Sequence, residues 1–418
     1  MVHQYRLAAR TSATQLLPSL AACALLVSLP FDAVPLPIQA QIIPLSTLLA
    51  IAFVPLIPGR IRLSRVAQAV LALTAFALVH SLLLLLLDVT VHAADLTRVL
   101  AWARQVAALG AGVVFFLVLR TALTLVSDRF IVRWVLIGAS PALLLGALNV
   151  LWYVSGSASL GAIVGAVRGI LVPSGFTSPY RASGLSLEPG YFAFFLASVV
   201  LPIELAVLFS GRQPWRYLIL TMVSVLCFLW TASGRGFVIL ASFLLLGVIL
   251  GPRRLLFASI GSLCLLLILA FMVWFPDNYF SLVLAKLLSG TWGKSLDSKI
   301  YGSFGPFFAV FSSYVLLGYG LGGVATHLEE IVPPTLSEAV AYYAWEDMPN
   351  LASLVARVFA QLGLVGLVLL GCVVVFALQE VRASRRSCPQ GFRAVFLGVA
   401  RLSILATVIA VSIGYGSF

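Results

Sequence analysis

The sequence has few charged residues. Asp, Glu, Lys and Arg make up 10% of the 418 residues, whereas hydrophobic residues make up 61%. A soluble protein of this length needs a charged surface around its core, so water cannot be the main solvent of this chain. The mean hydropathy of +1.10 agrees, because helices that are apolar on every face are stable where lipid replaces water. The sequence therefore predicts an integral membrane protein.

Cysteine is also scarce, and the nucleotide and metal motifs are missing. The five cysteines show no paired spacing, and four of them lie inside apolar runs. This pattern indicates small apolar core residues and gives no support for a zinc site or a disulfide framework. The sequence contains no GxxxxGK[ST], HExxH or GxSxG motif, which argues against a built-in nucleotide site. We expect no metal ion and no cofactor.

The net charge is +12, but the basic residues are not clustered in one stretch of the sequence. The basic residues are distributed over short loops between apolar runs, so they do not form the stripe that nucleic-acid binding requires. The distribution favours contacts with anionic membrane lipids and, for a few arginines, with a phosphorylated substrate. Nucleic acid is therefore excluded as a partner.

The apolar runs predict an all-α, polytopic helical bundle with about eleven transmembrane helices, in a range of ten to thirteen, forming one domain over residues 1–418. The expected spans are residues 12–30, 38–57, 66–87, 100–119, 134–153, 190–210, 217–233, 236–251, 255–275, 350–378 and 395–416. The first run is long for a cleaved signal peptide, so we expect an uncleaved span. The short apolar segment Phe304–Gly318 could be a re-entrant helix, an interfacial helix or a further span, and this choice decides the side of the C-terminus.

Arginine distribution predicts the orientation. Arginines gather in alternate connections, which the positive-inside rule places in the cytoplasm. These arginines are Arg60, Arg62, Arg65, Arg120, Arg129, Arg133, Arg212, Arg216, Arg253, Arg254, Arg382, Arg385, Arg386 and Arg393. The long segments 154–189 and 276–349 carry most of the acidic residues and are expected to face outward.

Glu188 is the first candidate functional residue on the outward side. It stands just before Pro189, Gly190 and Tyr191, where an apolar span begins. A carboxylate before a first-turn proline could simply serve the free N–H groups of a helix start. Alternatively, it could lie beside a cavity and accept a proton from a sugar hydroxyl.

Arg235 is the second candidate, in an outward turn between Gly234 and Gly236. A tight helix–helix turn explains the glycines but not the arginine. A guanidinium flanked by glycines suits a phosphate group, because it forks onto two oxygens and leaves room for the ligand. The alternative is a contact with a lipid headgroup.

The segment 276–349 is far longer than a connection requires, and such loops are usually lids or binding loops. We expect short helices here that cover an active site. Its aromatic and acidic patch, with Tyr343, Glu346 and Asp347, suits carbohydrate and equally suits an interfacial aromatic belt. Asn350 then opens a span that would carry Arg357 about two turns deep, facing a polar cavity in preference to reaching back to the interface.

Four stretches taken in order resemble the bacterial O-antigen polymerase and ligase superfamily. They are RASGLSLEPGYFAFFLASVV from residue 181, TASGRGFVIL from 231, GYGLGG from 318 and PNLASLVARVFAQLGLVGLVLL from 349. The resemblance covers about residues 181–370, and the first five spans add only hydropathy. The ligases usually carry a His shortly before the late Asn, where this chain has Glu346 and Asp347, and the turn has an inserted glycine. Both departures favour a polysaccharide polymerase over a lipid A core ligase.

The resemblance implies a metal-independent, inverting glycosyltransferase in the bacterial inner membrane, with its active site facing the periplasm. Its substrate would be an undecaprenyl-diphosphate-linked oligosaccharide for O-antigen, capsule or exopolysaccharide. Arg181 and Arg235 would hold the diphosphate, Glu188 would act as the base, and a chain-length regulator and a flippase would be pathway partners. Arginines can neutralise a departing diphosphate without a metal, and the long loop would exclude water.

Two other classes of function are open. A transporter or flippase for a polyprenyl-linked sugar would need broken helices or paired charges at mid-membrane depth, whereas most charges here are expected at the membrane faces. A non-catalytic scaffold of a polysaccharide export system has no evident need for the candidate arginines and Glu188.

Overall fold

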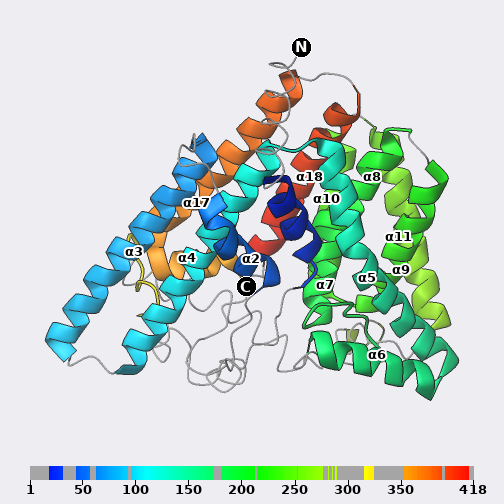
Figure 1. Cartoon of the computed structure of the whole chain (residues 1–418), viewed down its shortest axis with the longest axis horizontal. Coiled ribbons are helices and arrows are strands. Elements are labelled where there is room, and N and C mark those ends of the chain that lie inside the picture. The colour runs from blue at the N-terminus through cyan, green and yellow to red at the C-terminus, as the bar shows by residue number, and fades with distance from the viewer. Residues whose placement is uncertain are drawn as a thin grey trace, which may run out of the picture. The chain divides into compact units, whose positions relative to one another are not determined.

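The computed structural model describes residues 18–31, 44–56, 63–92, 96–172, 180–211, 214–251, 253–275, 315–323, 353–387 and 391–413, with isolated positions between 281 and 289. Helices make up the regular structure of these segments (Figure 1). Seven helices of the described segments are long and apolar enough to cross a membrane: Arg65–Leu87, Arg98–Thr124, Asp128–Ser155, Pro189–Phe209, Arg254–Trp274, Leu354–Ser387 and Phe392–Ser412. The prediction of a polytopic helical membrane protein is therefore confirmed in this coarse form.

Shorter helices occupy the other predicted spans. They are Pro18–Ser28, α2 (Leu45–Phe53), α9 (Pro214–Thr231) and α10 (Gly234–Leu250). Whether each of them crosses the membrane is not decided by length, so the total of about eleven spans stays a prediction. The expected outward loop 154–189 is corrected in one respect, because its first part forms the helix α6 (Ala158–Leu171).

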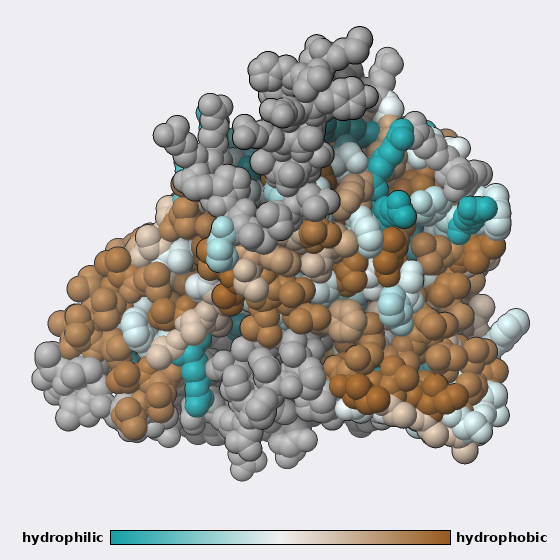
Figure 2. All heavy atoms as spheres, in the orientation of Figure 1, coloured by the Kyte–Doolittle hydropathy of each residue, from teal (hydrophilic) through white to brown (hydrophobic). Residues whose placement is uncertain are grey.

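Apolar side chains cover wide areas of the described surface (Figure 2). Helix α11 (Arg254–Trp274) is the clearest case. Leu255 is 85% exposed, and Val273 and Trp274 near the other end of the helix are 76% and 78% exposed. A helix this apolar on its outer face is stable only against lipid, which agrees with a membrane location.

The chain divides into two compact units, and the first is residues 1–62, 114–281 and 384–404. Its helices include α5 (Asp128–Ser155), α6, the span Pro189–Phe209, α9, α10 and α11. The span consists of α7 (Pro189–Phe195), the π-helix η2 (Leu196–Val200) and α8 (Leu201–Phe209). Most of this span is buried among its neighbours, and it forms the centre of the unit.

The π-helix is held by a neighbouring span. A π-turn leaves the regular hydrogen-bond ladder, so a backbone group inside the membrane needs another partner. The hydroxyl of Ser403 in α18 (Phe392–Ile413) donates to the carbonyl oxygen of Ser198 at 2.6 Å. The interruption is therefore part of the packed structure of the first unit.

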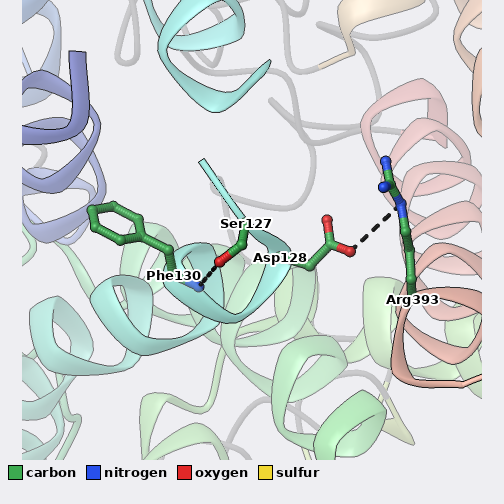
Figure 3. A network of polar contacts seen from close by, with 4 residues as sticks. All are labelled: Ser127, Asp128, Phe130 and Arg393. Atoms are coloured by element: carbon green, nitrogen blue, oxygen red, sulfur yellow. Dashed lines mark hydrogen bonds and ion pairs between the residues drawn. The ribbon is translucent and has the colours of Figure 1, made fainter. Parts of the chain in front are cut away.

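One end of the first unit collects predicted cytoplasmic connections. Ser127 caps α5 by accepting from the Phe130 N–H at 3.3 Å, and Asp128 lies 3.6 Å from the Arg393 guanidinium at the start of α18 (Figure 3). In another predicted cytoplasmic connection, Arg253, just before α11, donates to the carbonyl of Phe209 at the end of α8, at 3.1 Å. The starts of α5 and α18 therefore lie together, at connections that the arginine pattern assigns to one side of the membrane. Which compartment they face stays a prediction.

The second unit is residues 63–113, 282–383 and 405–418. It contains α3 (Arg65–His92), most of α4 (Leu96–Thr124) and α17 (Leu354–Ser387). Helix α17 is broken at Gly363, where φ is 61° and ψ is −157°. Segment 315–323 lies against this break, and the part of the expected re-entrant segment before residue 315 lies outside the described residues.

Backbone hydrogen bonds repair the break in α17. The N–H groups of Tyr319 and Gly320 donate to the carbonyls of Ala360 and Gln361, both at 2.8 Å. After the break, the N–H groups of α17 residues 364 and 365 donate to the carbonyls of residues 315 and 316, at 2.9 and 3.2 Å. Non-helical backbone at membrane depth is stable only when its polar groups are satisfied in this way.

Candidate functional site

A buried arginine positions the turn that carries the first candidate residues. Arg168, in the last turn of α6, is 1% exposed. Its guanidinium donates to the carbonyls of Gly184 at 2.5 Å, Ser186 at 3.0 Å and Leu187 at 3.5 Å. These bonds fix the chain between Arg181 and Glu188. Sequence analysis missed Arg168, although an arginine in an apolar 14-residue stretch was a usable signal.

Arg181 is attached to the end of α9. Its Nε donates to the carbonyl of Thr231 at 3.0 Å, and the next N–H, of Ala182, donates to the carbonyl of Trp230 at 3.0 Å. The Asn149 side chain from α5 donates to the Arg181 carbonyl at 3.3 Å. Arg181 is therefore held by two helices, with its side chain half-buried.

The connection from α9 to α10 is a turn of two residues, Ala232 and Ser233. Ala232 has a φ of 45°, the left-handed region that a side chain rarely adopts. This conformation reverses the chain at once, so α10 begins at Gly234 and Arg235 is its second residue. The prediction that Arg235 lies in the loop itself is corrected: it belongs to the first turn of a helix.

Gly236 serves packing, which corrects the expectation that both glycines make room for a ligand. A Cβ at Gly236 would lie 2.6 Å from the ring of Phe228 and 2.8 Å from the Cβ of Ala193. The missing side chain therefore lets α10 approach α7 and α9 closely. This close approach brings the starts of α7 and α10 together.

Glu188 is the N-cap of α7, and Pro189 is the first residue of the helix. The Glu188 backbone carbonyl accepts from the N–H groups of Tyr191 and Phe192 at 3.2 and 3.3 Å, but its side chain makes no capping hydrogen bond. The carboxylate is exposed. The helix position of Glu188 is thus as predicted, whereas the carboxylate does not serve the helix start.

Tyr191 connects the two helix starts. The guanidinium carbon of Arg235 lies 5.4 Å from the centre of the Tyr191 ring, within the range of a cation–π interaction. From the sequence we expect Arg235 to hold the diphosphate and Tyr191, at the start of the span after Glu188, to contribute to substrate binding. The structure brings them together, and through the two-residue turn it also brings Arg235 close to the Arg181 anchor at Thr231.

The starts of α7 and α10 add positive potential to this cluster. The N-cap side chains, Glu188 and Ser233, accept no hydrogen bond from the following N–H groups. Helix N-termini attract anions through the helix dipole and through N–H groups that have no partner within the helix. At α7, Pro189 has no N–H and the N–H groups of Tyr191 and Phe192 donate to the Glu188 carbonyl, so the dipole is its main contribution. Two half-buried arginines and two such N-termini are an arrangement suited to an anionic group. We call Arg181, Glu188, Tyr191 and Arg235 the α7–α10 cluster.

Aromatic rings border the cluster on the Arg181 side. Tyr153 contacts Tyr180 at a centroid distance of 5.6 Å and Trp230 at 4.9 Å, and Trp230 contacts Phe275 at 5.2 Å. Tyr180, which precedes Arg181, is 55% exposed. These edge-on contacts hold the rings together, and Trp230 is buried among them at 2% exposed. Sequence analysis did not single out Tyr153 or Tyr180, because their contact joins separate segments.

Arg357 lies in the second unit, and its depth is corrected. Ser353 caps α17 by accepting from the Ala356 N–H at 3.3 Å, and the Ser353 hydroxyl donates to the Ser412 carbonyl at 2.7 Å. Helix α17 therefore begins at Leu354, and Arg357 is its fourth residue. It lies in the first turn and is half-buried, not two turns deep.

The remaining candidates cannot be placed. Tyr343, Glu346, Asp347 and Asn350 lie outside the described residues, as does most of the expected lid 276–349. Among the described part of the chain, no group of three His, Cys, Asp or Glu side chains is arranged to hold a metal ion.

Comparison with known proteins returns no relative. No protein-family model matches the chain, and neither the curated proteins nor the solved structures contain a match. The resemblance to O-antigen polymerases and ligases therefore depends on the four ordered stretches alone.

Proposed function

We propose that the protein is a polysaccharide polymerase that acts on undecaprenyl-diphosphate-linked oligosaccharides at the periplasmic face of a bacterial inner membrane. The observation that carries the proposal is the α7–α10 cluster. Arg181 and Arg235, 54 positions apart in the printed sequence, adjoin the same two-residue turn beside two helix starts. A diphosphate needs this combination of bidentate guanidinium groups and backbone donors.

The proposed glycosyl transfer requires the protein to neutralise the departing diphosphate and to remove a proton from the acceptor hydroxyl. The diphosphate becomes a good leaving group once its developing charge is neutralised, and Arg181 and Arg235 supply that charge in a site bordered by apolar rings. The acceptor hydroxyl must lose a proton while it attacks the anomeric carbon from the opposite face, which gives inversion. The exposed Glu188 carboxylate, free of a capping role, is the base in this proposal.

The aromatic border supports a sugar-binding role in the same proposal. Sugar rings stack their C–H faces on aromatic side chains, and Tyr180 and Tyr153 adjoin the diphosphate-binding arginine. Residues Tyr343, Glu346, Asp347, Asn350 and Arg357 would complete substrate binding. A chain-length regulator and a flippase of the same pathway would be partners, and transfer to lipid A core is the alternative acceptor reaction.

A second candidate, translocation of a polyprenyl-linked sugar, is favoured by the break in α17. Interrupted helices at membrane depth are typical of transporters, where half-helices surround the substrate. The break at Gly363, together with the π-helix in the Pro189–Phe209 span, meets the condition that this alternative requires. Polymerisation is preferred because the α7–α10 cluster gathers anion-binding groups and a carboxylate at a helix start.

One experiment separates the two functions. The purified protein in proteoliposomes is supplied with a polyprenyl-diphosphate oligosaccharide, and the products are analysed for length and for the side of the membrane on which they lie. Polymerisation predicts longer oligosaccharides together with free polyprenyl diphosphate. Unchanged oligosaccharide that moves between leaflets would reject the polymerase and establish translocation.

A further inference from the structure

A carboxyl group with no part in the proposed glycosyl transfer lies inside the span Pro189–Phe209. Glu204, in α8, is completely buried, with 0% of its surface exposed. It is fifteen residues beyond Pro189, which corresponds to about 22 Å along the helix. Glu204 is therefore remote from the α7–α10 cluster and needs a separate explanation.

Two hydroxyl groups of α9, those of Ser224 and Thr221, face the Glu204 carboxyl group. The Ser224 hydroxyl of α9 donates to Glu204 Oε1 at 2.8 Å, whereas Oε2 has no hydrogen-bond partner among the described residues. No ion pair in the described part of the chain includes Glu204. An ionisable group inside the membrane without a countercharge is costly and is a functional candidate by default.

Neither the Cys227 thiol nor the arginine at the end of α8 supplies Glu204 with a countercharge. The Cys227 thiol of α9 is buried nearby, and its Sγ donates to the Leu143 carbonyl at 3.5 Å. The guanidinium of Arg253 is at the end of α8, where it donates to the Phe209 carbonyl. A negative charge on Glu204 would therefore be neither solvated nor paired within the described structure.

We propose that Glu204 is a proton-binding site inside the membrane, with Ser224 as the hydroxyl through which the proton is exchanged. The ligand is a single proton: the Ser224 hydroxyl passes its own proton to Oε1 and takes up another from the next hydroxyl group, and the carboxylate forms when the proton leaves by the reverse step. The proposal stands independently of the glycosyl transfer assigned to the α7–α10 cluster.

Helix α9 supplies a route for the proton. Tyr217, Thr221 and Ser224 are spaced by four and three residues, so they lie on one face of the helix. The Thr221 hydroxyl donates to the Tyr217 carbonyl at 2.7 Å, and both side chains are partly buried. The row ends at the exposed side chains of Trp215 and Arg216, at the start of α9. Hydroxyl groups therefore follow the helix from its exposed end to the carboxyl group.

Reaction with dicyclohexylcarbodiimide tests the site. The reagent dissolves in apolar surroundings, and a protonated carboxyl group adds its O–H across one C=N bond, after which the acyl group moves to nitrogen. No other product forms, so the peptide that contains Glu204 gains the mass of one reagent molecule. We expect this adduct in the full-length protein in detergent, with a yield that falls as the pH rises, and its loss in Glu204→Gln.

Glu188 is the matched control, since its carboxylate is exposed. A water-soluble carbodiimide with an added amine should modify Glu188 and leave Glu204 unmodified. Glu204→Gln keeps the shape and the Ser224 bond of a neutral carboxyl group, so its thermal unfolding midpoint should equal that of the unchanged protein. Absence of the Glu204 adduct at every pH, a yield that does not change with pH, or failure of Glu204→Gln to fold would each overturn the proposal.

Discussion

Arg235 lies over the ring of Tyr191, with 5.4 Å between its guanidinium carbon and the ring centre. The two residues belong to the first turns of α10 and α7, so one contact joins two helix starts. A guanidinium that stacks on a ring through its face carries its N–H groups at its edge, which is the part that binds oxygen ligands. The contact therefore fixes the position of the arginine at the start of α10.

Substitution of Arg235 should separate charge from geometry. Arg235→Ala is expected to lower polymer synthesis about 10- to 100-fold, the equivalent of one charge-assisted hydrogen-bonding group. Arg235→Lys should retain part of the activity, because it keeps the charge and loses the bidentate fork. Polymer length on a ladder gel, at matched membrane abundance, measures both.

Arg216 provides the control for Arg235. Its guanidinium lies 5.1 Å from the ring of Trp215 at the opposite end of α9, in a similar contact with no link to the α7–α10 cluster. Arg216→Ala should leave polymer length unchanged. Equal losses from Arg216→Ala and Arg235→Ala would show that the effect comes from stability or insertion.

Glu188 tests the identity of the base. Because its side chain makes no capping bond, Glu188→Ala should change the free energy of unfolding by no more than about 0.5 kcal/mol. If the carboxylate removes the proton from the acceptor, Glu188→Gln and Glu188→Ala should both abolish long polymer. Long polymer from Glu188→Gln would remove Glu188 from this role and leave Glu346 and Asp347 as candidates.

Arg168 should be essential for stability and not for chemistry. Arg168→Met leaves two buried carbonyl groups and one partly buried carbonyl group without their donor and is expected to lower the free energy of unfolding by about 3 kcal/mol or more. Arg168→Lys should lower the free energy of unfolding by less, since an ammonium group can still donate to one or two of these carbonyl groups. Thermal unfolding in detergent gives the comparison, and an unchanged midpoint for Arg168→Met would contradict the assigned role.

Gly363 tests the break in α17. A Cβ at this position would lie 2.4 Å from backbone atoms of Leu316, and the φ of 61° disfavours any side chain. Gly363→Ala should therefore lower the unfolding midpoint. Gly371→Ala in the same helix is the control, because its Cβ would meet no atom within 4 Å and alanine favours helix by about 1 kcal/mol. Equal tolerance of both substitutions would contradict the observed break.

The orientation can be tested without any assumption about function. In a background lacking the native cysteines, single cysteines at positions 62, 214 and 384 should be protected from membrane-impermeant thiol reagents in intact cells, since arginine-rich loops are retained in the cytoplasm. Labelling occurs only after the membrane is permeabilised. Labelling of any of the three from outside would overturn the predicted orientation.

The sequence by itself determined the class of the molecule and the position of most helices. Hydropathy and arginine content are properties of short segments, so they predict the spans and their alternation without knowledge of partners. For the same reason Glu188 and Pro189 were recognised as a helix start, as the structure has them.

Only the tertiary structure decided what each polar residue contacts. Arg168 and Arg235 are both arginines close to glycines in the sequence, yet one is buried under three carbonyl groups and the other lies at a helix start. Gly363 breaks α17 because segment 315–320 supplies hydrogen bonds from more than forty residues away. Burial and hydrogen-bond partners depend on segments that meet only when the chain folds, and no local pattern contains them.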